Sequence, residues 1–174
     1  MSGLILPYRG RLPTIAPGAW VAPTATVIGD VTVGEGSSLW FGVIVRGDLC
    51  GIRIGARTNL QDGTVVHVSS RGLGAEIGDD VTVGHMAMIH ACRLEDGSFV
   101  GMKACVLDGA VVETGAMVAA GAVVSPGKRV RTGELWAGVP ARPMRTLTEN
   151  ERRNLIETAR HYVDLAADYA AEER

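Results

Sequence analysis

One aliphatic residue recurs at every sixth position over most of the chain. From Ile15 onward the sequence divides into blocks such as "VIGDVT", "VGEGSS", "IGDDVT", "VGMKAC" and "VAAGAV", each opening on Val, Ile or Leu. A small or branched residue usually stands at the fifth place. This period fits neither the two-residue alternation of an ordinary strand nor the 3.6-residue stripe of a helix. Self-similarity at a fixed period predicts stacked coils that share one core.

The repeat predicts a triangular prism. Each block supplies one short strand and one turn, three blocks complete a coil, and the opening aliphatics point to the axis. Gly and Asp-Gly or Glu-Gly pairs supply the turn geometry at the corners. We therefore expect a single domain, residues 1–174, with an all-β parallel β-helix over about residues 15–134. An open β-sandwich is the alternative, but sandwiches do not keep a fixed six-residue period over about a hundred residues.

The C-terminal part of the chain predicts one helix. The segment "LWAGVPARP" leaves the prism, and Thr148 to Glu151 ("TENE") form a capping box that opens a helix over 148–172. Its apolar stripe should lie back against the coils. The stripe consists of Leu155, Ile156, Ala159, Tyr162, Val163, Ala166 and Ala170.

Composition excludes several classes of protein. The chain is 47% hydrophobic with a net charge of −2, so it offers no electrostatic attraction to nucleic acid or to an anionic membrane. No apolar run approaches the roughly eighteen residues of a membrane span. The start, "MSGLILPYRG", lacks the basic region of a signal peptide. Cys50, Cys92 and Cys105 lack metal-ligand spacing, and we interpret them as reduced core cysteines of a cytoplasmic protein.

Two histidines share one edge of the predicted prism. Once a five-residue outgrowth at 72–76 is removed, His67 is second in "VHVSSR" and His90 is second in "IHACR", one coil further on. Arg46, second in "VRGDLC", joins the same column. Neighbouring rungs lie about 4.7–4.9 Å apart. Two stacked imidazoles can therefore reach one metal ion with nitrogens at about 2.0–2.1 Å from it.

His85 lies around a corner from this column. It is third in "VGHMAM", and its own column places Asp62 of "LQDGTV" one coil below. In a three-fold assembly of prisms, the His67/His90 edge of one chain can face the His85 edge of the next. Such a trimer would hold a three-histidine site at each subunit boundary. His161, on the C-terminal helix, has no such context and is expected to be a surface residue.

A structural interpretation remains open for the polar neighbours. A lone histidine is usually a hydrogen-bonded polar side chain with no further role. Here three of the four histidines lie within two successive coils, which makes that interpretation less favoured. Arg46 and Asp48 are consistent with a structural ion pair, and Asn59, Gln61 and Asp62 with corner residues that bond the backbone. For Asp48 and Asp62 we favour a role in holding subunits together.

These residues resemble the gamma-class carbonic anhydrases. The matching pieces are "RGD" at 46–48, "NLQD" at 59–62, His67 and "GHMAMIH" at 84–90, and the likeness extends through "WAGVPARP" to the terminal helix. The bare hexapeptide repeat is less specific, because acyltransferases share it. The resemblance implies left-handed coiling and a homotrimer with one metal at each interface.

The resemblance also implies the chemistry. His67 and His90 of one chain and His85 of the next would bind zinc, although iron(II) or cobalt also suits imidazole ligands. Three histidines leave a fourth position open, as in catalytic zinc sites. Metal-bound hydroxide would then attack carbon dioxide to give bicarbonate.

The resemblance assigns roles to further residues. Gln61 and Asn59 would orient hydroxide and bicarbonate, and Tyr162 would lie over the pocket. Three residues would tie subunits together beside the site, namely Arg46, Asp48 and Asp62.

The chain departs from the best-known members in its proton relay. Those carry a glutamate directly after Arg-Gly-Asp, where Leu49 stands here. They also carry a longer acidic loop after the first histidine, whereas "VSSRGLGAEIG" holds only Glu76. We therefore expect metal binding without a fast relay. Two other functions remain open, a metal-dependent acyl-CoA thioesterase and a non-enzymatic trimeric assembly subunit. A hexapeptide acyltransferase is less favoured because its single general base needs no three-histidine arrangement.

Overall fold

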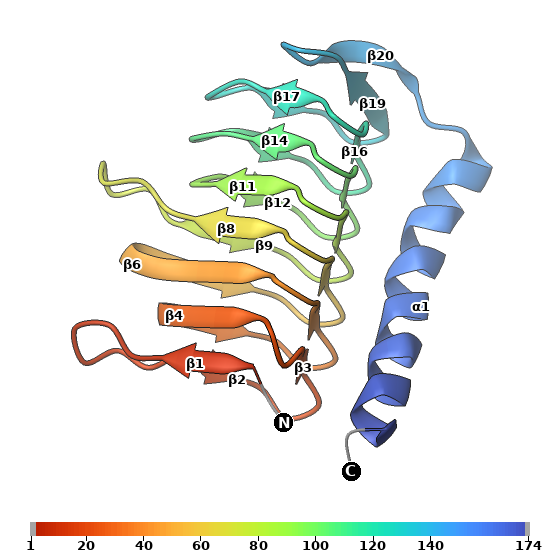
Figure 1. The fold of residues 1–174 in the computed structure, drawn as a ribbon. Coiled ribbons are helices and arrows are strands. Elements are labelled where there is room, and N and C mark those ends of the chain that lie inside the picture. Colours follow the sequence, from red (N-terminus) through yellow and green to blue (C-terminus); the bar gives the residue numbers. More distant parts are fainter. Residues whose placement is uncertain (1–2, 173–174) are drawn as a thin grey trace.

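Stacked coils with one helix alongside form the molecule (Figure 1). The computed structural model describes residues 3–172. Successive coils pair through parallel ladders, so the chain is a parallel β-helix whose three faces each carry one strand of a coil. The predicted all-β solenoid with a C-terminal helix is confirmed. Strand pairing begins at Leu4, before the first hexapeptide block.

The first face carries the strands that lead to His67 and His90. Its ladder runs β1-β4-β6-β8-β11-β14-β17. The strands are β1 (Leu4–Leu6), β4 (Thr26–Val33), β6 (Ile44–Ile54), β8 (Val65–His67), β11 (Met88–His90), β14 (Cys105–Val106) and β17 (Val123–Val124).

The second face continues from the first through the long strands. The N-terminal part of β6 pairs with β8 and its C-terminal part pairs with β9, so β6 contributes to both faces. The remaining strands of this face are β2 (Thr14–Ile15), β9 (Ala75–Ile77), β12 (Arg93–Leu94), β15 (Val111–Val112) and β18 (Arg129–Val130).

The third face is the one that the helix covers (Figure 1). Its last strand pairs antiparallel with its neighbour and ends the stack of coils. The strands are β3 (Trp20–Val21), β5 (Ser38–Leu39), β7 (Asn59–Leu60), β10 (Thr82–Val83), β13 (Phe99–Val100), β16 (Met117–Val118), β19 (Glu134–Ala137) and β20 (Arg142–Thr146).

The aliphatic residues that open the blocks form the core. In β8, Val66 is fully buried between the half-buried Val65 and His67, because neighbouring side chains of a strand point to opposite sides. Burying one Val or Ile contributes about 1.5–3 kcal/mol. The same arrangement recurs in the neighbouring coils, at Val27, Val45, Ile89, Val106 and Val124.

The C-terminal helix α1 (Glu149–Glu172) begins with the predicted capping box. Thr148 Oγ1 accepts a hydrogen bond from the Glu151 amide at 3.2 Å, and Glu151 accepts one from the Thr148 amide at 2.9 Å. The predicted apolar stripe is buried or half-buried, and His161 is exposed as expected. In residues 3–172, no helix combines the length and the apolar character that crossing a membrane requires.

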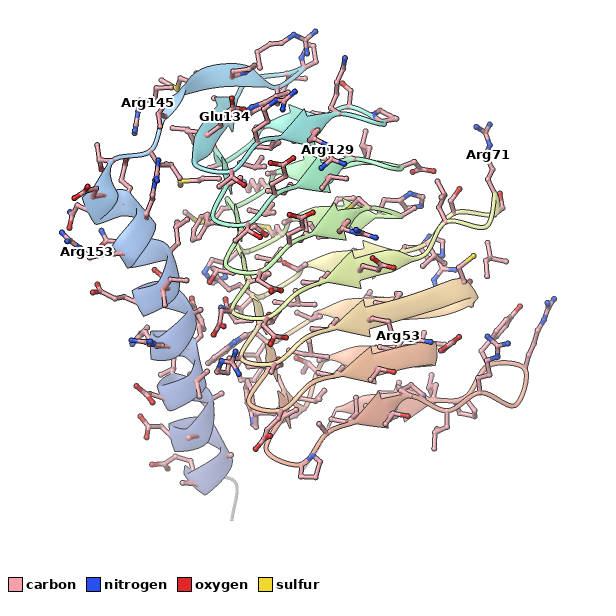
Figure 2. The ribbon with its side chains drawn as sticks, turned by 180° about the vertical axis from the view of Figure 1, so that it is seen from behind. Arg53, Arg71, Arg129, Glu134, Arg145 and Arg153 are labelled. Carbon is pink, nitrogen blue, oxygen red and sulfur yellow. The ribbon has the colours of Figure 1, made fainter. Side chains whose placement is uncertain are left out.

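The outgrowth between the two histidine coils lies slightly earlier than the six-residue count predicts. Glu76 pairs in register with Arg53 of β6 and Arg93 of β12, so it belongs to the solenoid. The protruding loop is therefore 69–74, and Figure 2 shows Arg71 reaching outward from it. This shift does not affect the pairing of His67 with His90, because the loop still lies in the connection from β8 to β9.

Candidate metal centre

His67 and His90 stand on adjacent rungs of the first face. They are direct ladder partners, and Arg46 precedes them in the same column. The Nδ1 atom of His67 lies 3.3 Å from Nε2 of His90. Two nitrogens bound to a tetrahedral zinc at about 2.0–2.1 Å lie about 3.3–3.4 Å apart. The pair therefore has the spacing of two ligands on one metal ion.

Asp48 holds the other nitrogen of His67. Its Oδ1 lies 3.0 Å from His67 Nε2, and the same carboxylate pairs with Arg46. Burial raises the pKa of Asp48, but the hydrogen bonds from His67 and Arg46 outweigh it and hold the pKa below its usual value. A carboxylate at Nε2 favours the tautomer that carries the proton there, which leaves the lone pair on Nδ1, the atom that faces His90.

Asp108 engages one nitrogen of His90 in the same way, and it is not among the residues that the sequence indicated. Its Oδ1 lies 2.6 Å from His90 Nδ1, and this hydrogen bond lowers the pKa of Asp108, with burial acting against it and Ser69 adding a smaller effect. The block "VLDGAV" presents Asp108-Gly109 as an ordinary turn, which it also is, since Gly109 has a φ of 66°. The sequence did contain a signal for this contact. Asp108 is third in its block, the same place that Asp62 occupies in its own block, where it was paired with His85.

His85 occupies a corner turn. The turn closes from the Ala87 amide to the Gly84 carbonyl at 3.3 Å, and His85 is its second residue. His85 Nδ1 lies 2.8 Å from Asp62 Oδ2, as the shared column predicted. This bond engages Nδ1 and leaves Nε2 for a further ligand.

His85 and His90 lie at opposite edges of the first face. His85 lies in the corner turn before β11 and His90 ends that strand, so the extended chain from Ala87 to His90, roughly 10 Å, lies between the two edges. One ion cannot bridge that distance. In agreement, no group of three or more possible metal ligands gathers within a single chain over residues 3–172. A three-histidine site would therefore need two chains.

Gln61 and Tyr162 lie at the His85 edge. Gln61 is buried and donates from Nε2 to Asn59 Oδ1 at 3.1 Å, while Asn59 Nδ2 donates to Thr82 Oγ1 at 2.9 Å. Asn59 thereby fixes the amide of Gln61 beside the corner. Burial raises the pKa of Tyr162, and the negative charge of Asp62 adds to it, so the tyrosine is near this corner.

The carboxylates expected of a proton relay are absent from the positions that the resemblance pointed to. Glu76 lies on the second face and pairs with Arg93 at 2.8 Å. Leu49 is 52% exposed and lines a cavity of about 230 Å³ beside Asp48. Tyr8 and Arg9 line the same cavity.

Fold and site together define a hexapeptide-repeat β-helix protein with three histidine–carboxylate pairs on two edges of one face. No family model matches the chain. A hexapeptide transferase family protein from Anaplasma phagocytophilum has a crystal structure that matches with a TM-score of 0.92 at 43% identity, over 95% of this chain and 98% of that one.

Two curated relatives narrow the class. The carbonic anhydrase of Geobacillus kaustophilus is 41% identical over 168 residues, which is 97% of this chain and 92% of that protein. Gamma carbonic anhydrase 2, mitochondrial, of Arabidopsis thaliana is 48% identical over 167 residues, which is 93% of this chain and only 60% of the plant protein. The chain belongs to the gamma carbonic anhydrase family.

Proposed function

We propose that three copies of the chain bind zinc at their interfaces and catalyse the reversible hydration of carbon dioxide to bicarbonate. Iron(II) or cobalt are the alternative metals, since imidazole suits all three. The observation that carries the proposal is the 3.3 Å approach of His67 Nδ1 to His90 Nε2. Each of these rings has its other nitrogen on a carboxylate, the arrangement that supports metal-binding histidines in proteins.

The first face supports assembly of a trimer. An outward column of apolar side chains runs up its ladder, and Ile44 in it is 41% exposed. The other members are Val65, Met88, Cys105 and Val123. Met86 and Met102, at the turns before β11 and β14, are 56% and 54% exposed. Contact with further copies would remove this apolar surface from water.

The position of this column explains why the oligomer would be cyclic. The column lies between the His85 edge and the His67/His90 edge. If the first faces of three chains turn toward a common axis, each chain brings one edge against the opposite edge of the next. Such a head-to-tail contact closes into a ring. Each boundary then joins His67 and His90 with His85 of the partner subunit.

The chain's own residues would supply binding and orientation. Zinc held by three imidazoles supplies Lewis acidity that makes water nucleophilic near neutral pH. Gln61, fixed by Asn59, offers its amide to orient the attacking water and bicarbonate. Tyr162 would limit the pocket from the helix side.

Three residues would act at the subunit boundary. Arg46 and Asp62 each engage a carboxylate or an imidazole within the chain, and we propose that they and Asp48 also support the contact between subunits.

The alternative functions share the same metal site. A thioesterase would need a groove for the pantetheine arm, and a cavity of about 640 Å³ lies on the second face. Two arginines that line this cavity already form ion pairs, Arg93 with Glu76 and Arg129 with Glu113. Because these arginines are engaged within the chain, they do not offer their charge to an anionic acyl-CoA, and the cavity does not favour the thioesterase. An assembly subunit would use the metal only to hold the trimer.

Stopped-flow hydration of carbon dioxide tests the proposal. Metal-loaded protein should be active, and His85→Ala should lose activity by about a hundredfold or more because one of three ligands is removed. His161→Ala is the matched control, since His161 is exposed on α1 and is the one histidine of the four that is not a candidate ligand. It should retain full activity.

Other outcomes of the same assay choose between the functions. Hydration that is unchanged in His85→Ala contradicts the proposed site. Turnover of acyl-CoA thioesters without hydration selects the thioesterase. Dissociation of the trimer on chelation, without activity in either assay, selects the assembly subunit.

We also propose the cytoplasm as the compartment. Cys50, Cys92 and Cys105 are free, whereas oxidising compartments favour disulfides. Because the Arabidopsis relative carries "mitochondrial" in its name, fractionation of cells that express the tagged chain is the appropriate measurement.

A further inference from the structure

We propose that Asp108 is a positioning residue of the metal centre, holding His90 in the tautomer that presents the Nε2 lone pair to the metal. The inference rests on the proposed function, because it concerns the same site. It adds a residue that lies one coil beyond the two histidines and outside every motif that carried the family resemblance.

The contact geometry points to this role. His90 Nδ1 lies 2.6 Å from Asp108 Oδ1, which is short for a hydrogen bond and typical of one with a charged acceptor. A neutral imidazole carries one N–H, so a carboxylate on Nδ1 leaves the lone pair on Nε2. That atom is the one that faces His67 Nδ1 at 3.3 Å.

The two rings are complementary. Asp48 accepts from Nε2 of His67, so the lone pair of that ring is on Nδ1. Asp108 accepts from Nδ1 of His90, so its lone pair is on Nε2. Both lone pairs therefore point into the space between the rings, where a cation would lie. Without Asp108, His90 would be free to place its proton on Nε2 and turn a donor toward that space.

A turn role alone does not account for the contact. The Leu107–Ala110 turn closes through its backbone at 2.9 Å, independently of the carboxylate. Asp96-Gly97 forms a comparable corner elsewhere, and there the carboxylate accepts a backbone amide, from Asp79 at 2.9 Å. At position 108 the carboxylate instead reaches the imidazole in the previous coil.

Asp108→Asn is the sharpest test, because an amide has the same shape but no negative charge, so it can at best accept from His90 Nδ1 through a weaker neutral hydrogen bond and can instead turn an N–H donor toward the ring. Cobalt(II) titration followed by visible absorption, and zinc affinity by chelator competition, are the readouts. We expect a 10- to 100-fold loss of zinc affinity and an altered cobalt spectrum. The unfolding temperature of the metal-free protein should stay near that of the wild type.

Asp96→Asn is the matched control. It changes the same residue of the same kind of Asp-Gly turn, and its Oδ1 can still accept the Asp79 amide. It should bind zinc and cobalt as the wild type does.

The outcomes separate this inference from the proposed function. Wild-type affinity and an unchanged cobalt spectrum in Asp108→Asn overturn the positioning role while the metal site stands. A fall in metal-free stability with unchanged affinity also overturns it, since that is a structural effect. A wild-type protein that binds neither metal overturns the proposed function and this inference together.

Discussion

Each of the three candidate ligand histidines has one ring nitrogen on a carboxylate. Asp48 serves His67, Asp62 serves His85, and Asp108 serves His90. A neutral imidazole cannot orient itself, and a carboxylate partner fixes both its proton and its ring plane. At the scale of single residues, each carboxylate therefore engages one nitrogen of its ring and leaves the other for a further partner, as the proposed metal site requires.

Leu49 is the residue whose replacement we expect to speed turnover. It is exposed, follows Asp48 directly, and stands where the family members that the sequence resembles carry a glutamate. Leu49→Glu would add a proton acceptor beside the site, and a positioned acid or base often contributes a large factor to rate. We expect hydration measured in dilute buffer to rise by about tenfold.

Leu73→Glu provides the comparison for this change. Leu73 is 43% exposed on the 69–74 loop, so Leu73→Glu adds the same negative charge as Leu49→Glu but at a different place. It should not change the rate. An equal rise in both variants, or a rise in Leu49→Glu that persists in concentrated buffer, would mean that proton transfer is not the affected step.

At the scale of elements, the corner turns decide which side chains can meet. Asp62 and His85 occupy the second position of turns that close from Thr64 to Gln61 and from Ala87 to Gly84. Stacking of successive coils then puts one turn directly over the other. Local contacts also fix the helix, because Glu151 of its capping box accepts hydrogen bonds from Arg145 of the last strand, β20.

Glu151 makes the attachment of α1 dependent on pH. Hydrogen bonds from Arg145 of β20, and then from Thr148, lower the pKa of Glu151 to about 2 from its ordinary 4.5. A depressed folded-state pKa gives stability that is present above 4.5 and is lost as the pH falls toward 2. Glu151→Gln should therefore lower the urea midpoint at pH 7, and its difference from wild type should shrink below pH 4.5.

Glu149→Gln is the control from the same helical turn. It should leave the urea midpoint near the wild-type value across this range. If the deficit of Glu151→Gln were the same at pH 3 as at pH 7, the ionised contact with Arg145 would not be its source.

At the scale of the whole molecule, the three candidate ligand histidines lie at the two edges of one face. Its apolar column is flanked by the His85 edge and by the His67/His90 edge, and α1 covers the third face instead. The helix therefore leaves the first face available for other copies. A trimer in solution should have three times the 18.3 kDa mass of the chain.

Mixing two inactive variants tests whether the site is shared. In a trimer of His67→Ala and His85→Ala chains, a boundary is intact when the first variant lends His85 and the second supplies His67 and His90. Random assembly of equal amounts makes about one boundary in four intact. Refolded or co-expressed mixtures should regain about a quarter of the wild-type hydration rate.

Each variant refolded alone is the baseline for this experiment. A mixture that remains as inactive as its components would mean that all three ligands come from one chain or that no shared site forms. Size-exclusion chromatography with light scattering on the same samples shows whether the mixed chains have assembled.

The sequence by itself determined the fold and most of the candidate site. A six-residue period repeats the same inward positions in every block, so the solenoid and the register of Arg46, His67 and His90 follow from counting. The stacking of Asp62 under His85 follows in the same way. The capping box likewise set the start of α1, because that signal is local.

Only the tertiary structure decided how the side chains engage. Asp108 looked like a turn residue, because an Asp-Gly pair carries a strong local preference that masks a second role. The outgrowth lay at 69–74 because ladder pairing, rather than block counting, assigns Ala75 and Glu76 to β9. A periodic pattern fixes which residues share an edge, but side-chain rotamers and contacts between coils fix which atoms face one another.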